Sequence, residues 1–175
     1  IQLTPFTHKE LLPPGLVNFK SLSSYLLRGG FPRSYLAKST KLSYTWRNSF
    51  IETFLQRDLP EIGFNIPPDT AIRLWKMCAH SQGQLLNASR LGDSLGYNYQ
   101  TIQRYLDIFQ GTFMLRLLPP FLPNLKKRLV KSSKIYVRDT GILLALLNLA
   151  SMEDVLGHPV FGPACAPSPE GRLKR

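Results

Sequence analysis

The chain has 175 residues, with 22 Lys or Arg against 11 Asp or Glu, so its formal net charge is +11. Its hydrophobic fraction of 43% is ample for a packed core and excludes wholesale disorder. A transmembrane helix is excluded, because no run of about 18 apolar residues occurs. The two cysteines, Cys78 and Cys165, are too few for a disulfide framework or a four-ligand zinc site, which favours a reducing compartment. We therefore expect a cytoplasmic protein with no membrane partner and, from its basic excess, a polyanionic partner such as nucleic acid.

The first part of the chain predicts a strand remnant followed by helices. Ile1 and Leu3 alternate with polar residues before Pro5, a pattern typical of the last half of a strand. A short helix is predicted over 21–28 and a long one over about 39–59, which Pro60 ends. The apolar side chains of the long helix recur at helical spacing. The polar residues expected to face away from them are Arg47, Asn48, Glu52 and Gln56.

The next part predicts three helices followed by a β-ribbon. Helices are expected over about 69–83, 88–95 and 98–111, and strands over 113–118 and 134–138. This order is typical of a winged helix. An apolar helix over 141–149 and a short one over 152–156 are expected to follow. The predicted fold class is thus mainly α with a small β-ribbon: a helical region followed by a winged-helix (helix-turn-helix) domain.

The stretch from Arg90 to Leu106 carries a helix-turn-helix pattern. Two helices cross steeply only where the first offers a small residue, which Gly92 supplies, and Gly96 allows a positive φ in the turn. The predicted buried positions are Leu91, Leu95, Tyr97, Ile102 and Tyr105. The residues expected to face the major groove of DNA are Tyr99, Gln100, Gln103 and Arg104. The alternative is a domain of this kind that packs against protein and touches no nucleic acid.

Positive charge is concentrated on the predicted ribbon. Residues 113–140 hold seven Lys or Arg and one Asp, a net +6. The ribbon residues predicted to contact DNA phosphates are Lys126, Lys127, Arg128, Lys131 and Lys134. The alternative is a solvated hairpin whose charges discourage pairing with other strands.

Catalytic signatures are absent from the sequence. It contains no Gly-x-x-x-x-Gly-Lys-Ser/Thr phosphate loop. Cys78 and His80 are two residues apart on a predicted helix, so they lie on different faces and make a poor metal pair. No nucleophile, base and orienting group can be assembled. We predict no catalytic residue, no metal site and no enzymatic activity for this chain.

Several motifs resemble a known family. Residues 117–141, from Leu117-Leu118-Pro119-Pro120 to Asp139-Thr140-Gly141, are similar to a stretch of a widespread prokaryotic family of AAA-type P-loop ATPases with a C-terminal domain of unknown function. The family also has motifs similar to four more segments of this chain, and they occur in the same order. These segments are Leu3-Thr4-Pro5-Phe6, Gly29-Gly30-Phe31-Pro32, Arg57-Asp58-Leu59 and Gly157-His158-Pro159-Val160.

The resemblance implies a piece of a longer, modular protein. The family has an N-terminal ATPase core, connecting helices, a winged helix and a C-terminal nuclease-like domain. Residues 1–66 would then hold a strand remnant of the core and connecting helices, 67–140 the winged helix, 141–161 the helical start of the C-terminal domain, and 162–175 a disordered tail. ATP and Mg²⁺ are expected only in the missing core, and no cofactor in this chain. The tail departs from the family after Gly162, which suggests a frameshift that sequencing of the locus would reveal.

Three functional hypotheses follow. The leading one is a non-catalytic C-terminal fragment of such an ATPase whose winged helix binds DNA. The second is a protein-interaction module that docks on the ATPase core or on a partner protein. The third, a residual ATP-dependent enzyme, predicts nucleotide hydrolysis by the isolated chain, which is not expected without a phosphate loop.

Overall fold

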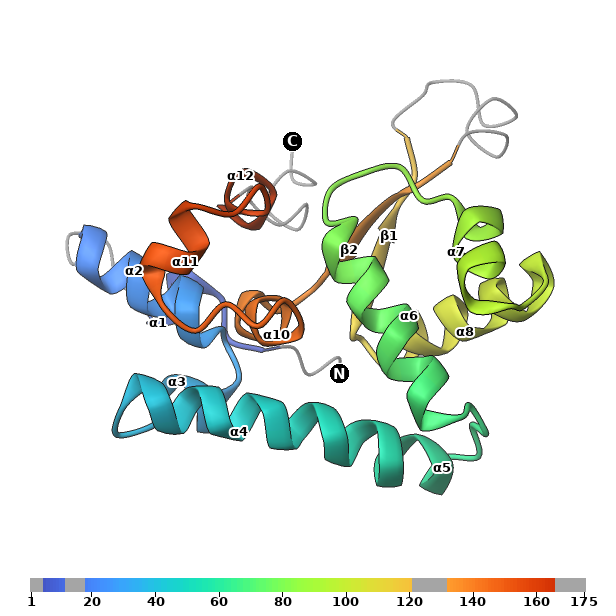
Figure 1. Ribbon diagram of the computed structural model, residues 1–175. Coiled ribbons are helices and arrows are strands. Elements are labelled where there is room, and N and C mark those ends of the chain that lie inside the picture. The colour runs from blue at the N-terminus through green and yellow to red at the C-terminus, as the bar shows by residue number, and fades with distance from the viewer. Residues whose placement is uncertain (1–4, 12–17, 121–131, 166–175) are drawn as a thin grey trace. The chain divides into compact units, whose positions relative to one another are not determined.

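A computed structural model describes residues 5–11, 18–120 and 132–165 (Figure 1). The chain is mainly helical with one two-stranded antiparallel sheet, which confirms the predicted fold class at this level. It divides into two compact units. Unit 1 combines residues up to Asp58 with Asp139–Cys165, and unit 2 comprises Leu59–Arg138.

The elements of unit 1 come from both of its chain segments. The first segment forms α1 (His8–Leu11), α2 (Phe19–Arg28), α3 (Pro32–Tyr35), α4 (Thr40–Thr53) and the π-helix η1 (Phe54–Asp58). The second forms α10 (Thr140–Leu146), α11 (Met152–Leu156) and α12 (Phe161–Cys165). Segments 1–66 and 141–161, which the sequence analysis treated as separate, therefore both contribute to one unit. The predicted tail at 162–175 overlaps α12, and its remainder lies outside the described residues.

Unit 2 holds the remaining elements. They are α5 (Leu59–Glu61), α6 (Pro68–His80), α7 (Ala88–Leu95), α8 (Tyr99–Gly111), β1 (Leu115–Leu118) and β2 (Lys134–Val137). The predicted bounds of α7 are confirmed, and those of α8 are correct to within one residue. The strands are shorter than predicted: Phe113 has a φ of 63° and does not continue the strand.

Helix α10 is the centre of unit 1. Its apolar run leaves every residue from Gly141 to Leu146 buried, and the helix packs on both α2 and α4. The apolar side chains expected at helical spacing along the long helix do pack together: Trp46 stacks on Phe50 with 5.3 Å between ring centroids, and Phe50 stacks on Phe54 of η1 at 6.0 Å. Burial of this aromatic and aliphatic surface supplies the main driving force for folding of the unit.

The position of Arg47 differs from the one that helical periodicity predicts. This residue was expected to face solvent, but its side chain is completely buried. Helix α4 is covered by α2, α3 and α10 rather than along one stripe, so a residue outside the apolar stripe is enclosed as well. The Nη1 of Arg47 donates a hydrogen bond to the carbonyl of Leu27. Burial lowers the pKa of Arg47 to about 10, although the nearby charge of Asp139 acts in the opposite direction.

The carboxylate of Asp139 joins the two segments of unit 1. One oxygen accepts a hydrogen bond from the amide of Gly30 at 2.7 Å, and the other accepts from the amide of Ile142 at 2.9 Å and so caps α10. Burial raises the pKa of Asp139, while these amides and the charge of Arg47 lower it. A Cβ at Gly29, whose φ is +71°, would collide with this carboxylate, and a Cβ at Gly141 would collide with the carbonyl of Arg28.

Gly30 also contacts the start of the described chain. The amide of Phe6 donates to the carbonyl of Gly30 at 2.8 Å, and the hydroxyl of Tyr25 donates to the carbonyl of Phe6 at 3.0 Å. A Cβ at Gly30 would collide with that same Phe6 carbonyl. The strand remnant predicted at the very start falls on residues 1–4, which lie outside the described residues.

The Asp139 junction predicts a large stability effect. Asp139→Ala leaves the amides of Gly30 and Ile142 and the charge of Arg47 without their buried partner. We therefore expect the free energy of unfolding to fall by about 3–5 kcal/mol. Urea denaturation followed by tryptophan fluorescence measures this. Asp58→Ala is the matched control, because Asp58 forms an exposed ion pair with Arg57 that is worth about 1 kcal/mol or less. Equal midpoints for the two variants would contradict the assigned role.

Candidate nucleic-acid interface

Three helices and the hairpin of unit 2 share one core. Helix α6 packs on α7 and β2, and α8 packs on α7 and β1. Trp75 of α6 and Phe109 of α8 meet at the centre with their ring centroids 5.2 Å apart. Other large side chains that are fully buried in this unit include Leu74, Ile102, Leu106, Leu115 and Ile135. The core fixes α8 against the hairpin, so side chains on the outer surface of both elements have defined positions.

The turn between α7 and α8 has the predicted glycine geometry. Gly96 ends α7 with φ 77° and ψ 27°, a left-handed conformation that glycine adopts without strain. The amide of Tyr97 donates to the carbonyl of Gly92 at 3.0 Å. A Cβ at Gly92 would collide with the carbonyl oxygen of Tyr97, so the close approach at this position requires glycine. The side chain of Asn98 then caps α8 by accepting from the amide of Thr101 at 2.8 Å.

The five predicted buried positions of this region divide into two groups. Leu91, Ile102 and Tyr105 are buried as predicted, whereas Leu95 and Tyr97 are half-buried. The hydroxyl of Tyr97 shares a hydrogen bond of 3.2 Å with Thr70 of α6. Its ring meets that of Tyr105 edge to face. Tyr97 thus connects the turn to α6 through its hydroxyl group and to α8 through its ring.

A third extended segment lies along β2. β1 pairs with β2 in antiparallel register, with Leu115 opposite Val137 and Leu118 opposite Lys134. On the other edge of β2, Leu85 forms an antiparallel bridge with Lys134. The amide of Gly83 donates to the carbonyl of Ile135 at 2.7 Å, and the amide of Ile135 donates to the carbonyl of Gln84 at 3.0 Å. The amide of Leu86 donates to the carbonyl of Ser133 at 2.8 Å. The sequence analysis missed this segment, because 82–86 is too short to show an alternating pattern of its own.

The predicted residues on α8 differ in availability. Tyr99, Gln100 and Arg104 are exposed. Gln100 and Arg104 are four residues apart and therefore lie on the same face of the helix. Gln103 is half-buried, and its amide donates to the carboxylate of Asp107 at 3.0 Å. A side chain held in this way is less free to pair with a base than Gln100.

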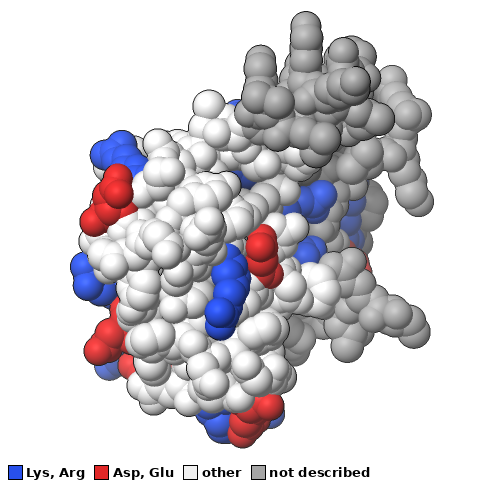
Figure 2. All heavy atoms as spheres, turned by 90° about the vertical axis from the view of Figure 1, so that its right-hand side faces the viewer, with Lys and Arg blue, Asp and Glu red and all other residues white. Residues whose placement is uncertain are grey.

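The predicted ribbon residues are described only at one end. Lys134 is exposed at the start of β2. Lys126, Lys127, Arg128 and Lys131 lie outside the described residues. In the described part of unit 2 the charges are mixed, because exposed Asp93 and Asp107 occupy the same two helices as the candidate site. Figure 2 accordingly shows few charged side chains on the side of unit 2 formed by α7 and α8.

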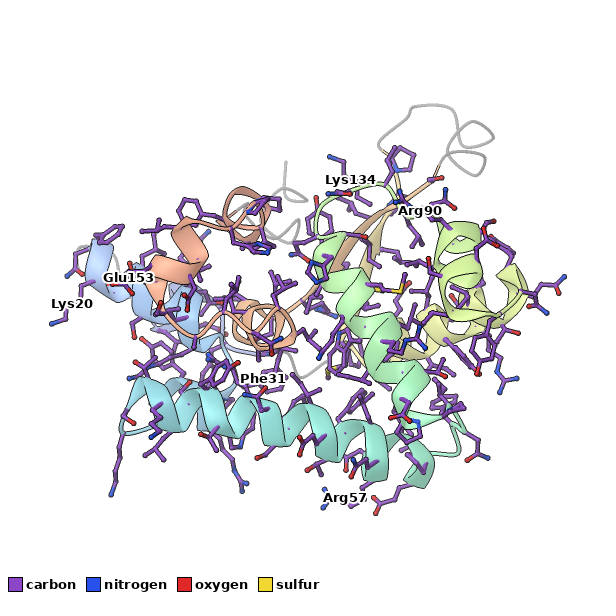
Figure 3. All side chains as sticks on the ribbon, in the orientation of Figure 1. Lys20, Phe31, Arg57, Arg90, Lys134 and Glu153 are labelled. Atoms are coloured by element: carbon purple, nitrogen blue, oxygen red, sulfur yellow. The ribbon has the colours of Figure 1, made fainter. Side chains whose placement is uncertain are left out.

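Arg90 is a site residue that the sequence analysis did not assign. It is exposed in the first turn of α7, whose N-cap residue Asn87 accepts a hydrogen bond from the Arg90 amide at 3.0 Å. Figure 3 shows Arg90 and Lys134 at the same end of unit 2, where β1 ends and β2 begins. The two are connected through the Leu85–Lys134 bridge and the short chain from Leu85 to α7. The sequence could have indicated Arg90, because it is a basic residue at the start of the first helix of the helix-turn-helix pattern.

The described residues offer little for metal or nucleophilic chemistry. No group of three His, Cys, Asp or Glu side chains that could hold a metal ion occurs among them. Burial raises the pKa of the Cys78 thiol to about 12, so this cysteine stays protonated and unreactive at neutral pH. Within the described ranges, no helix has the length and apolar character needed to span a bilayer.

The chain belongs to a family described as a domain of unknown function, DUF8612, whose model matches residues 19–153. Uncharacterized proteins of Mycobacterium bovis and Mycobacterium tuberculosis are each 45% identical to it over 136 residues. That alignment covers 78% of this chain but 31% of each relative, so the chain spans about a third of the relatives' length. No solved structure matches it. None of these descriptions names an activity, and the resemblance to AAA-type ATPases stays a prediction.

The close approach at Gly92 predicts an asymmetric response to alanine. Gly92→Ala forces the α7–α8 turn to move, and we expect a loss of stability of about 1–3 kcal/mol. Gly111→Ala at the end of α8 is the matched control, because its Cβ would meet nothing within 4 Å and alanine favours a helix. Thermal unfolding by circular dichroism measures both. A Gly92 variant as stable as the Gly111 variant would rule out the tight crossing.

Proposed function

We propose that unit 2 is a winged helix that binds duplex DNA, in a chain that is a non-catalytic C-terminal part of an AAA-type ATPase. The observation that carries the proposal is the order of its elements. Helix α6, the extended segment at 82–86, helices α7 and α8, and the strands β1 and β2 follow one another as helix, strand, helix, helix, strand and strand. That order, with the first extended segment paired to the last strand, is the pattern of a winged helix.

Each part of the proposed interface has a chemical role. The exposed N-terminal half of α8 would enter the major groove, where Gln100 suits adenine and Arg104 suits guanine or a phosphate. Lys134 and the basic hairpin residues would lie along the phosphates. Arg90 would add a phosphate contact next to Lys134. The side chains proposed to contact bases are therefore Gln100 and Arg104, with Tyr99 beside them. Contacts with phosphates would supply most of the affinity.

A protein-interaction module is the second candidate. It is favoured by the sparse charge on the side formed by α7 and α8 (Figure 2) and by the exposure of two large side chains of unit 2, one on the segment 82–86 and one on α8. Leu85 is 65% exposed and Tyr99 54% exposed. Apolar and aromatic side chains of this kind are common anchors at protein interfaces. On this view the domain would dock on the ATPase core or on a partner protein.

ATP chemistry is assigned to a different part of the proposed parent protein. The phosphate-binding loop and the acidic residues that hold Mg²⁺ would belong to an N-terminal core, and this sequence contains no Gly-x-x-x-x-Gly-Lys-Ser/Thr motif. The role proposed for this chain is to bind rather than to catalyse. A phosphate loop in frame upstream of the coding sequence would support the proposed parent.

The salt dependence of DNA binding separates the two candidates. If phosphate contacts dominate, the affinity for a labelled duplex should fall steeply between about 50 and 200 mM salt. A triple alanine variant of Lys126, Lys127 and Arg128 should bind more weakly. Its slope of log K against log salt should be shallower by about 0.9 for each phosphate that no longer pairs with a cation. Fluorescence anisotropy measures both quantities.

The control for this experiment is the double alanine variant of Arg73 and Lys76. Both are exposed cations on α6, so the variant loses charge from unit 2 without altering α8 or the hairpin. It should retain most of the affinity. Undetectable or salt-insensitive binding by the unmodified chain would contradict the DNA proposal and favour the protein-interaction module.

Base reading by α8 predicts a ranking of single substitutions. After selection of a preferred duplex from a randomised library, Gln100→Ala and Arg104→Ala should each reduce the preference for that duplex by about 1–3 kcal/mol. Gln103→Ala should change it much less, because the Gln103 amide is already paired with Asp107. Competition binding against unrelated duplexes measures the ratio of the affinity for the selected duplex to the affinity for the others. A dominant effect of Gln103 would overturn the assignment of groove-facing residues.

A further inference from the structure

Acidic and basic residues are segregated along the chain of unit 1. Residues 11–51 include six Lys or Arg and no Asp or Glu, whereas residues 139–171 include four Asp or Glu and no Lys or Arg. These two stretches supply most of the two chain segments that build unit 1. One segment of the unit is therefore basic and the other acidic.

The basic segment exposes its charge where α3 meets α4. Arg33, Lys38 and Lys41 are all exposed there. Leu36 is 72% exposed and Leu42 is 54% exposed among them. We call these five residues the cationic corner. Among the described residues, no carboxylate forms a salt bridge with the corner.

The stability of α4 does not explain the corner. The N-terminus of a helix carries a partial positive charge, which favours acidic side chains in the first turn and disfavours basic ones. The first turn of α4 holds Lys41 and no acidic residue. A residue choice that opposes the local electrostatics, next to two exposed leucines, points to a function at this surface rather than to folding.

The acidic segment exposes a smaller surface of matching chemistry on α11. Glu153 is exposed, and Leu156 is 54% exposed one turn away. We call this pair the acidic face. Asp154 is already engaged, because its carboxylate accepts from the amides of Ser151 and Ala150. Within the described residues, no salt bridge engages Glu153.

The two surfaces lie on different sides of unit 1. In Figure 1, α4 runs along the lower edge of the unit and α11 lies above α2. We propose that the cationic corner of one copy binds the acidic face of a second copy, head to tail. Each surface offers what the other lacks, namely opposite charge around an exposed leucine. Because the two patches differ, such a contact is heterologous and extends to a ring or an open chain rather than a closed two-fold dimer.

Charge reversal of either surface tests the proposal on the full chain. Sedimentation velocity of the unmodified protein should show association that strengthens with concentration and weakens between about 50 and 500 mM salt, a range over which ionic screening increases strongly. The double variant Lys38→Glu/Lys41→Glu and the single variant Glu153→Lys should each raise the dissociation constant at least tenfold. Glu52→Lys is the control, because Glu52 is exposed on α4 away from the corner and should leave association unchanged.

Mixing the two defective variants distinguishes a head-to-tail contact from other modes. The corner variant keeps its acidic face, and the Glu153→Lys variant keeps its corner, so the mixture should associate again although neither variant does so alone. Circular dichroism verifies that each variant is folded. An unmodified protein that stays monomeric at low salt, or a mixture of folded variants that remains monomeric, overturns the proposal. Salt-insensitive association, or association unaffected by either reversal, overturns it equally.

Discussion

The buried carboxylate of Asp139 is the constraint on which the arrangement of unit 1 depends. It accepts from the amide of Gly30 in the first segment and from the amide of Ile142 at the start of α10, and Arg47 lies nearby as the compensating charge. A carboxylate in this position requires glycine at 29, where any side chain would collide with it. Asp139 also follows β2 after a single residue, Arg138.

The sequence predicted local elements well where short-range chemistry determines them. Helix α7 begins and ends as expected because Asn87 and Gly96 cap it, and the turn at Gly92 has the expected close approach. Arg47 could not be placed in this way. Helical periodicity identifies one apolar stripe, but it does not reveal that α2, α3 and α10 enclose α4 on further sides. The role of Asp139 was missed for the same reason, since its partner Gly30 is more than a hundred residues away in sequence.

The predicted DNA-contacting residues differ in how exposed the structure leaves them. Of the four predicted residues on α8, Tyr99, Gln100 and Arg104 are exposed, whereas Gln103 is half-buried and paired with Asp107. Spacing alone does not distinguish Gln100 from Gln103. The segment 82–86 was not predicted because its pairing with β2 is a tertiary contact that its own short sequence does not indicate. The proximity of Arg90 to Lys134 is likewise tertiary, although the place of Arg90 at the start of α7 could be read from the sequence. The family match covers residues of both units, and the relatives are about three times as long as the aligned part, so unit 2 is proposed as one module of a larger protein.

The most direct test of DNA recognition by unit 2 is a map of the contact surface on the ¹⁵N-labelled chain. Adding a short duplex at low salt should shift the backbone amide resonances of residues 99–104 on α8, together with those of Leu85, Arg90 and Lys134. Amides of α6 and of the core of unit 1 should stay unchanged. Shifts confined to α2–α4 and α11, or no shifts at millimolar duplex, would contradict the account and remove unit 2 as the DNA-binding element.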